Sequence, residues 1–225
     1  MAKNNRGGRT KSSSISQASS GTYVQMTDAI AQQIRDEVDD RYDSDVVDAI
    51  KNYISKATDS NGFSVSQNLN YKLDNGLKLN ATEQFVHDNI KNGMHDLSVD
   101  TTLTRACHDD ILQKLGIKDY SKLSEAQLKA KLVGTEYETT AYSSFGYDDK
   151  KNPFISGQNS GGREVIIKAK TGKNTQVVFG AKSQGEIITN IGTQYRINDV
   201  YYSGATATPR NKGSKPVVVL EVETI

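Results

Sequence analysis

The hydrophobic pattern of this chain changes its period along the sequence, and this change limits the folds available to it. Before residue 99, apolar residues recur every three or four positions, as on one face of an amphipathic helix. After residue 134, short runs rich in Thr, Val, Ile and Tyr alternate with turns rich in Gly, Asn and Lys. Helices first and strands second predict an α+β fold, with N-terminal helices packed on a mainly antiparallel two-sheet β-core, and argue against a doubly wound nucleotide-binding fold.

Apolar stripes, caps and β-branched runs give the expected elements. The sequence Asn80-Ala-Thr-Glu83 has the form of a capping box at the start of a helix. Helices are expected over residues 26–42, 45 to the turn at 59–62, 80–93, 109–115 and 124–132. Strands are expected over residues 99–105, 136–142, 163–169, 175–179, 186–189, 194–202 and 216–224.

Residues 1–25 differ in composition from the rest of the chain. They carry four basic residues and no acidic one, among Ser, Gly, Asn and Gln, which cannot form a core. We expect a disordered basic tail, which contacts phosphates, an acidic partner or only solvent. One domain is expected over 26–225, with a helical part over 26–98 and a β-rich part over 99–225.

The composition excludes several classes of function. With 28 basic and 27 acidic residues the formal net charge is +1, so nucleic acid is not expected as a partner beyond weak contact through the tail. No apolar run approaches the ~18 residues of a membrane span, and no secretory signal is recognisable, so we expect a cytoplasmic protein without a membrane partner. The single cysteine, Cys107, provides no disulfide and no cysteine-built zinc site, and no metal site is expected.

Three short motifs follow one another along the expected strands. "TLTR" ends at Arg105, "AYSSF" contains Ser143 and Ser144, and "QGE" places Gln184 two residues before Glu186. In a strand, residues two apart face the same side, so Gln184 and Glu186 would point together into one site. Each motif is too short to be informative alone.

The order Arg, Ser, Gln-x-Glu resembles the Arg-Ser-Glu class of mono-ADP-ribosyltransferases, specifically the Gln-x-Glu subgroup that includes bacterial exoenzymes modifying Rho GTPases. The pattern also looks like transferases encoded by bacteriophages. The resemblance covers roughly residues 46–225 and includes "NATEQFVHDNIKNGM" before the arginine strand, and "GEIITNIGTQYRINDVYY" and "KPVVVLEVETI" from the glutamate onward. It implies an ADP-ribosyltransferase fold and an enzyme that uses NAD as substrate, transfers ADP-ribose to a side chain of an acceptor protein and releases nicotinamide.

The resemblance also implies a role for each residue. Glu186 would stabilise the positive charge that develops on the ribose, through the 2′-hydroxyl, as carboxylates do in glycoside cleavage. Arg105 and Arg163 would bind the pyrophosphate, and Ser144 would hydrogen-bond Glu186 or the nicotinamide ribose. Gln184 would orient the acceptor, which favours asparagine, glutamine or a hydroxyl over arginine.

The chain departs from the family pattern near the serine. Phe145 and Gly146 follow Ser144 where the family has Ser-Thr-Ser or Ser-Thr-Gln, so Ser143 remains a rival for the serine role. Phe179, which we count with the cofactor-binding residues, is the nearest candidate for the aromatic residue of the exoenzymes' substrate loop. Because Phe179 lies five residues before Gln184, the acceptor protein need not be a GTPase.

A second departure concerns a phosphate contact. Leu73 is followed by Asp74 where the exoenzymes have an arginine, and whether Lys72 replaces it stays open. Two other functions also stay open: an NAD glycohydrolase, with water as acceptor, and an inactive virion-associated structural protein. If the chain is phage-encoded, its location would be the host cytoplasm or the virion.

Overall fold

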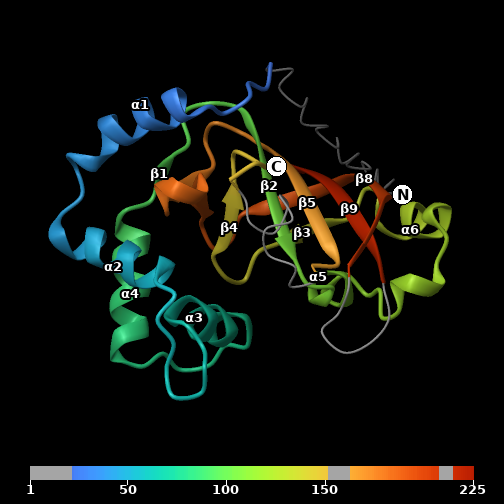
Figure 1. The fold of residues 1–225 in the computed structure, drawn as a ribbon, viewed down its shortest axis with the longest axis horizontal. Coiled ribbons are helices and arrows are strands. Elements are labelled where there is room, and N and C mark those ends of the chain that lie inside the picture. Colours follow the sequence, from blue (N-terminus) through green and yellow to red (C-terminus); the bar gives the residue numbers. More distant parts are fainter. Residues whose placement is uncertain (1–21, 152–162, 208–214) are drawn as a thin grey trace, which may run out of the picture.

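The computed structural model describes residues 22–151, 163–207 and 215–225, so most of the expected basic tail lies outside the described residues. Helices α1 to α4 come first in the chain and lie together at one end of the molecule, and the strands form the rest (Figure 1). The helices are α1 (Asp28–Asp39), α2 (Ser44–Ile54), α3 (Val65–Asp74), α4 (Ala81–Asn92), α5 (Asp110–Lys114) and α6 (Glu125–Leu132), with 3₁₀ turns η1 (Tyr120–Lys122) and η2 (Lys182–Gln184). The strands are β1 (His95–Asp96), β2 (Thr101–Cys107), β3 (Glu136–Glu138), β4 (Ser143–Gly146), β5 (Val165–Thr171), β6 (Gln176–Phe179), β7 (Glu186–Thr189), β8 (Gln194–Ala207) and β9 (Lys215–Thr224).

Nine strands form one sheet in the order β1-β6-β7-β4-β2-β5-β9-β8-β3. All neighbouring pairs are antiparallel except β5 and β9, so the expected α+β class with a mainly antiparallel core is confirmed. The expected division into two sheets is not seen in the hydrogen bonding. The single sheet has two halves, β1-β6-β7-β4 and β2-β5-β9-β8-β3. One paired position, Thr104 opposite Gly146, joins the two halves and makes the sheet continuous.

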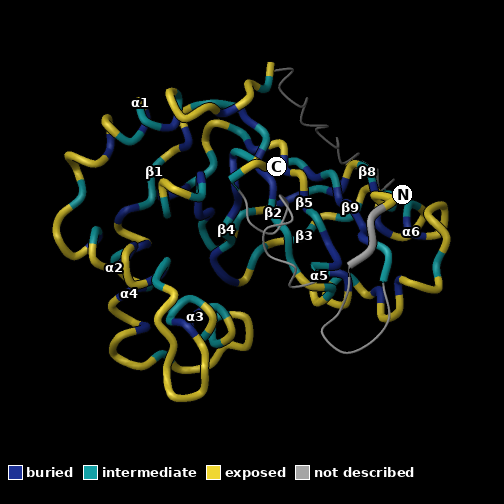
Figure 2. The backbone as a smooth tube through the Cα atoms, in the orientation of Figure 1, coloured by how far each residue is buried: buried dark blue, intermediate teal, exposed yellow. Residues whose placement is uncertain are grey.

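The half-sheet that contains β6 and β7 is buried on both faces. Val178 and Ile188 point toward α2, α3 and α4 and belong to one apolar cluster, whereas Phe179 and Ile187 belong to the larger cluster on the other face. Because neighbouring side chains of a strand point to opposite faces, burial of both faces explains the continuous apolar run of β7. Figure 2 shows buried residues following these inner strands, while the outer turns of the helices are exposed.

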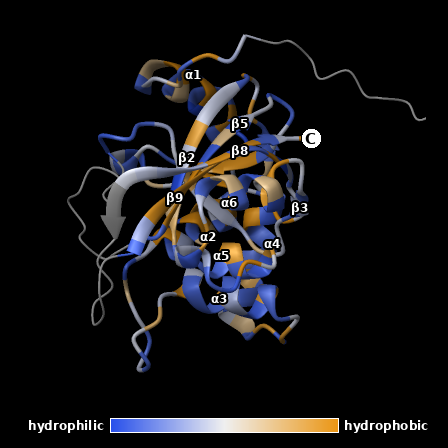
Figure 3. Ribbon diagram, turned by 90° about the vertical axis from the view of Figure 1, so that its right-hand side faces the viewer, coloured by the Kyte–Doolittle hydropathy of each residue, from blue (hydrophilic) through white to orange (hydrophobic). Residues whose placement is uncertain are grey.

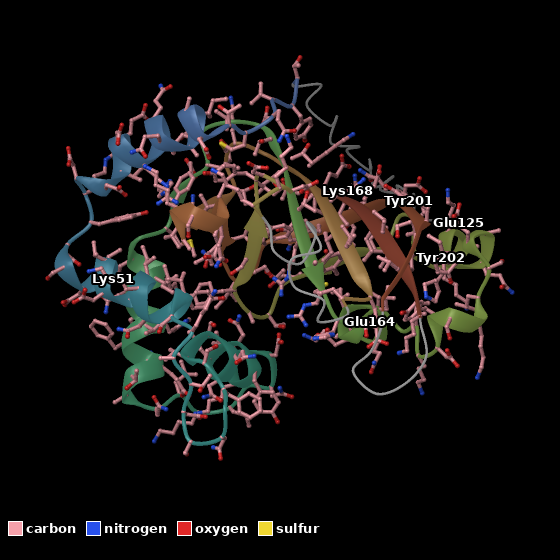
Figure 4. The ribbon with its side chains drawn as sticks, in the orientation of Figure 1. Lys51, Glu125, Glu164, Lys168, Tyr201 and Tyr202 are labelled. Carbon is pink, nitrogen blue, oxygen red and sulfur yellow. The ribbon has the colours of Figure 1, made fainter. Side chains whose placement is uncertain are left out.

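The larger cluster joins the long strands to α1, α5 and α6. Figure 3 shows apolar residues concentrated along β8 and β9. Tyr202 of β8 anchors α6, because its hydroxyl donates to the main-chain oxygens of Tyr120 and Leu123 and its main-chain N–H donates to Glu125. Figure 4 shows Tyr202 and Glu125 side by side, with Tyr201 next to Tyr202 on β8 and Lys168 on β5.

Several boundaries differ from expectation for identifiable reasons. Helices α4 and α6 lie within one residue of the expected bounds, because each starts with a capping box. Helix α3 was not expected, since only Leu69 of its ten residues is buried and its apolar stripe is weak. The expected strand over 136–142 ends early, at Glu138, and the serines begin a strand of their own, β4.

Replacing Ile188 by alanine is expected to lower the free energy of unfolding by about 2–5 kcal/mol. The Ile188 side chain is fully buried, and its removal would leave a cavity between β7 and the helices. Urea unfolding followed by circular dichroism measures the change. Leu77→Ala is the control, since Leu77 is 49% exposed, and it should shift stability by less than about 0.5 kcal/mol. Equal losses in the two variants would contradict the double-sided burial of β7.

Candidate functional site

A cleft of about 220 Å³ lies where α3 approaches β2, β4 and the start of β7. Four predicted site residues line it together: Arg105 from β2, Ser144 from β4, and Gln184 and Glu186 from the turn into β7. They come from positions up to 81 residues apart and meet because β4 pairs with both β2 and β7. We call this hollow the central cleft.

A second hollow of about 130 Å³ adjoins the central cleft and shares Arg105, Asn70 and Tyr142 with it. Ser143, the rival serine, lines this second hollow and not the central cleft, whereas Ser144 lies in the central cleft with Glu186. Alternation along β4 separates the two serines. Arg105 therefore lies in the wall that the two hollows share.

The turn that carries Gln184 and Glu186 is not the strand that we expected. Gln184 is the last residue of η2, Gly185 has a left-handed backbone with φ 59°, and only Glu186 begins β7. The expected same-face geometry is therefore wrong, and the glycine turn brings both side chains into the cleft. A side chain at Gly185 would be strained, and its Cβ would lie 3.3 Å from the Tyr147 ring.

The carboxylate of Glu186 is held by the backbone before it. Ala181 N–H donates to Oε2 of Glu186 at 3.0 Å, and Gly180 N–H donates to the main-chain oxygen of Glu186 at 3.0 Å. A Cβ on Gly180 would overlap the carboxylate of Glu186, so glycine at this position lets the carboxylate lie against the backbone without shifting. The backbone thus fixes one oxygen of Glu186 in place.

Helix α3 supplies cleft residues that our sequence reasoning missed. Ser66, Gln67 and Asn70 all line the cleft. The signal was present, because Ser64 and Gln67 form a capping box that marks the start of a helix.

Asn70 connects helix α3 to Tyr53 and to the main chain just before β4. Its Nδ2 donates to the hydroxyl of Tyr53 at 2.9 Å and to the main-chain oxygen of Tyr142 at 3.2 Å, while its Oδ1 is buried without a partner among the described residues. Tyr53 is 2% exposed, and burial raises the pKa of its phenol, although hydrogen bonds from Asn70 and Ser144 act in the opposite direction. Tyr53 therefore packs in the core and presents only its hydroxyl to the cleft, where Asn70 holds it in place.

The other two predicted site residues lie outside the central cleft. Arg163 hydrogen-bonds Nε2 of His108, whose Nδ1 lies 3.0 Å from the buried Glu164. Phe179 is 3% exposed and lies under Arg35, with the guanidinium carbon 4.6 Å from the ring centroid. Neither side chain is among those that line either hollow.

Near Asp74, where the exoenzymes have an arginine, the charged side chains form ion pairs. Lys72 donates to the buried Glu83 at 2.7 Å. Asp74 pairs with Lys114 at 2.9 Å, and both line the second hollow. Lys114 therefore brings a cation to the space beside Arg105, which the sequence did not single out.

Within the described ranges no group of three or more His, Cys, Asp or Glu side chains is placed to hold a metal ion. No described helix has the length and apolar character needed to cross a membrane.

Cys107 lines the second hollow, and burial raises the pKa of its thiol to about 11. Because the thiolate is the reactive form, we expect iodoacetamide to label the native protein at pH 8 about a hundredfold more slowly than the protein in denaturant. Mass spectrometry of timed samples measures both rates. Equal rates would show that the thiol is not protected.

Comparison with known proteins supports the fold assignment through structure and not through sequence. No protein-family profile and no curated protein matches the sequence. Among solved structures, Plx2a, an ADP-ribosyltransferase toxin from Paenibacillus larvae, matches with a TM-score of 0.64 at 13% identity, over 88% of this chain and 96% of that one. C3stau2 from S. aureus, solved with NAD, matches with a TM-score of 0.60 at 17% identity, over 91% and 98% of the two chains.

The enzymatic component C2-I of the C2-toxin from Clostridium botulinum matches with a TM-score of 0.61 at 15% identity, over 88% of this chain. The chain spans about half of C2-I, 48% of its length. The chain therefore has the fold of the ADP-ribosyltransferase toxins.

Proposed function

We propose that this protein is an NAD-dependent mono-ADP-ribosyltransferase that modifies a side chain of an acceptor protein and releases nicotinamide. The observation that carries the proposal is the meeting of Arg105, Ser144, Gln184 and Glu186 in one cleft. The motifs that carry these residues lie up to 81 positions apart in the sequence, and three strands and a turn bring them together in a fold shared with ADP-ribosyltransferase toxins. The β-rich part supplies all four, and the helical part contributes α3 to the opposite wall.

The donor set of the cleft suits a dinucleotide. A guanidinium pairs with two phosphate oxygens at once, so Arg105 would hold the pyrophosphate at the junction of the two hollows. Each half of NAD would then extend into one hollow. In the second hollow Lys114 is paired with Asp74 and would have to leave that ion pair to contact a phosphate oxygen. The Asn70 side chain lies in the wall that the two hollows share.

Glu186 would act on the step in which the glycosidic bond breaks. The bond between ribose C1′ and the pyridinium nitrogen breaks, and nicotinamide leaves with the electron pair, so positive charge develops on the ribose. A fixed carboxylate stabilises that charge more strongly than it stabilises the substrate, and it therefore lowers the barrier. The backbone contacts of Glu186 provide the fixed geometry that this effect requires.

Gln184 would orient the acceptor. The acceptor oxygen or nitrogen forms a bond to C1′ and releases its proton to solvent. An amide side chain both donates and accepts hydrogen bonds, which suits an asparagine, glutamine or hydroxyl acceptor. The acceptor protein is unidentified, and the likeness to phage-encoded transferases stays a prediction.

Glu186→Gln should reduce nicotinamide release and protein labelling by about a hundredfold or more, because it removes the charge while it keeps the side-chain shape. The assay incubates the purified protein with labelled NAD and a bacterial lysate, and follows nicotinamide by chromatography and labelled proteins on gels. The control is Glu37→Gln, the same chemical change on the exposed side of α1. If the two variants retain equal activity, the catalytic role of Glu186 is excluded. If the wild-type protein neither cleaves NAD nor binds it in calorimetry, the inactive structural alternative replaces our proposal.

Gln184→Ala should separate transfer from hydrolysis. Nicotinamide release into water should be largely unchanged, while labelling of the acceptor protein should fall about a hundredfold, because orientation of the acceptor is lost. Both products are quantified in the same reaction. Equal loss of both would assign Gln184 to NAD cleavage itself. Nicotinamide release without labelled protein in the wild type, across several lysates, would identify a glycohydrolase.

A further inference from the structure

Helix α1 contacts the turn that carries Gln184 and Glu186. Arg35 donates from Nη2 to the main-chain oxygen of Gly180 at 3.1 Å, and Lys182 donates to Gln32. Tyr147, whose ring packs against Gly185, donates its hydroxyl to Asp28 at 3.0 Å. Helix α1 is therefore attached to the turn on both sides of η2, although none of its residues lines the central cleft.

Arg35 contacts the backbone that holds Glu186 directly. Its guanidinium lies over the ring of Phe179, and its described hydrogen bond goes to a carbonyl oxygen, with no carboxylate among its described partners. Its Nε is buried without a partner in the described part of the chain. Burial lowers the pKa of the guanidinium, and the neighbouring Tyr147, Asp39, Tyr42 and Glu186 oppose this.

The carbonyl that Arg35 contacts belongs to the same peptide unit as the N–H that holds Glu186. Gly180 provides the C=O that accepts from Arg35, and Ala181 provides the N–H that donates to Oε2 of Glu186. A peptide unit is planar and conjugated, so a cation on its oxygen draws electrons from nitrogen and strengthens the N–H as a donor. The two hydrogen bonds therefore reinforce each other.

We propose that Arg35 is a positioning residue, which fixes the carboxylate of Glu186 through the polarised Gly180–Ala181 peptide unit. The catalytic consequence rests on the function proposed above. Arg35 lies behind the turn and does not line the cleft, so it should affect the cleavage step more than the binding of NAD. The requirement is a positive charge at the Gly180 oxygen, since the aliphatic stem alone cannot polarise the peptide.

Three variants test this. Arg35→Met keeps an unbranched stem over Phe179 and removes the charge, Arg35→Lys keeps a charged donor, and Arg41→Met is the control at an exposed arginine just after α1. For Arg35→Met we expect kcat for nicotinamide release to fall about tenfold, the effect of losing one charge-assisted hydrogen bond, with little change in KM for NAD. Arg35→Lys should recover most of kcat, and Arg41→Met should behave as the wild type.

A measurement without activity separates this inference from the proposed function. The amide proton of Ala181, observed by ¹H–¹⁵N NMR, should move upfield in Arg35→Met and return toward its wild-type position in Arg35→Lys, because its chemical shift follows the strength of the hydrogen bond. An unmoved resonance in a folded Arg35→Met protein overturns the inference, whether or not the wild type is active. Equal losses of kcat in Arg35→Met and Arg35→Lys also overturn it, because charge would then not be the operative property. If Arg35→Met does not fold, Arg35→Gln, which keeps a neutral donor without the charge, takes its place beside Arg35→Lys in the same two measurements. If the wild-type protein releases no nicotinamide, the proposed function is refuted. The NMR measurement alone then tests whether Arg35 polarises the Gly180–Ala181 peptide unit.

Discussion

Burial of both faces of the β6–β7 hairpin is the constraint on which the site depends. Val178 and Ile188 pack against the helices, and Phe179 and Ile187 pack in the larger cluster on the other face. A one-residue shift in the register of these strands would move each side chain to the opposite face, where other side chains already fill the space. The register of β7 is therefore fixed, and with it the position of Glu186 at the strand's first residue. A short turn connects the two strands before Glu186, and the left-handed backbone of Gly185 allows this turn to fold tightly.

The two layers of the molecule meet in the cleft, and each contributes differently. The sheet brings together residues distant in sequence, because β4 lies between β2 and β7. The helices supply the opposite wall through α3, and α1 contacts the turn from behind. The sheet carries both the cation of Arg105 and the carboxylate of Glu186, and α3 completes the wall of the cleft, so the cleft forms only when both layers have folded.

Elements with strong local signals were predictable from the sequence, and those that depend on tertiary contacts were not. The capping boxes at Asn80 and Ser124 placed two helices within one residue, and the apolar run after Glu186 gave β7 its bounds. Helix α3 escaped because it buries little, and the Gln184 turn was misjudged because an alternating pattern cannot report the left-handed glycine inside it. The order of the motifs along the chain identified four site residues: Arg105, Ser144, Gln184 and Glu186. Asn70 and Lys114 belong to helices, and only the packing of those helices against the sheet places them near Arg105.

The central claim is that the cleft between α3 and the strands binds NAD, with the pyrophosphate at Arg105 and the nicotinamide ribose at Glu186. A crystal structure of the Glu186→Gln variant soaked with NAD tests this directly, because the variant should bind the dinucleotide without cleaving it. We expect the pyrophosphate oxygens within hydrogen-bond distance of Arg105 and the ribose 2′-hydroxyl beside residue 186. NAD bound outside this cleft, or no bound NAD at saturating concentration, would contradict the account.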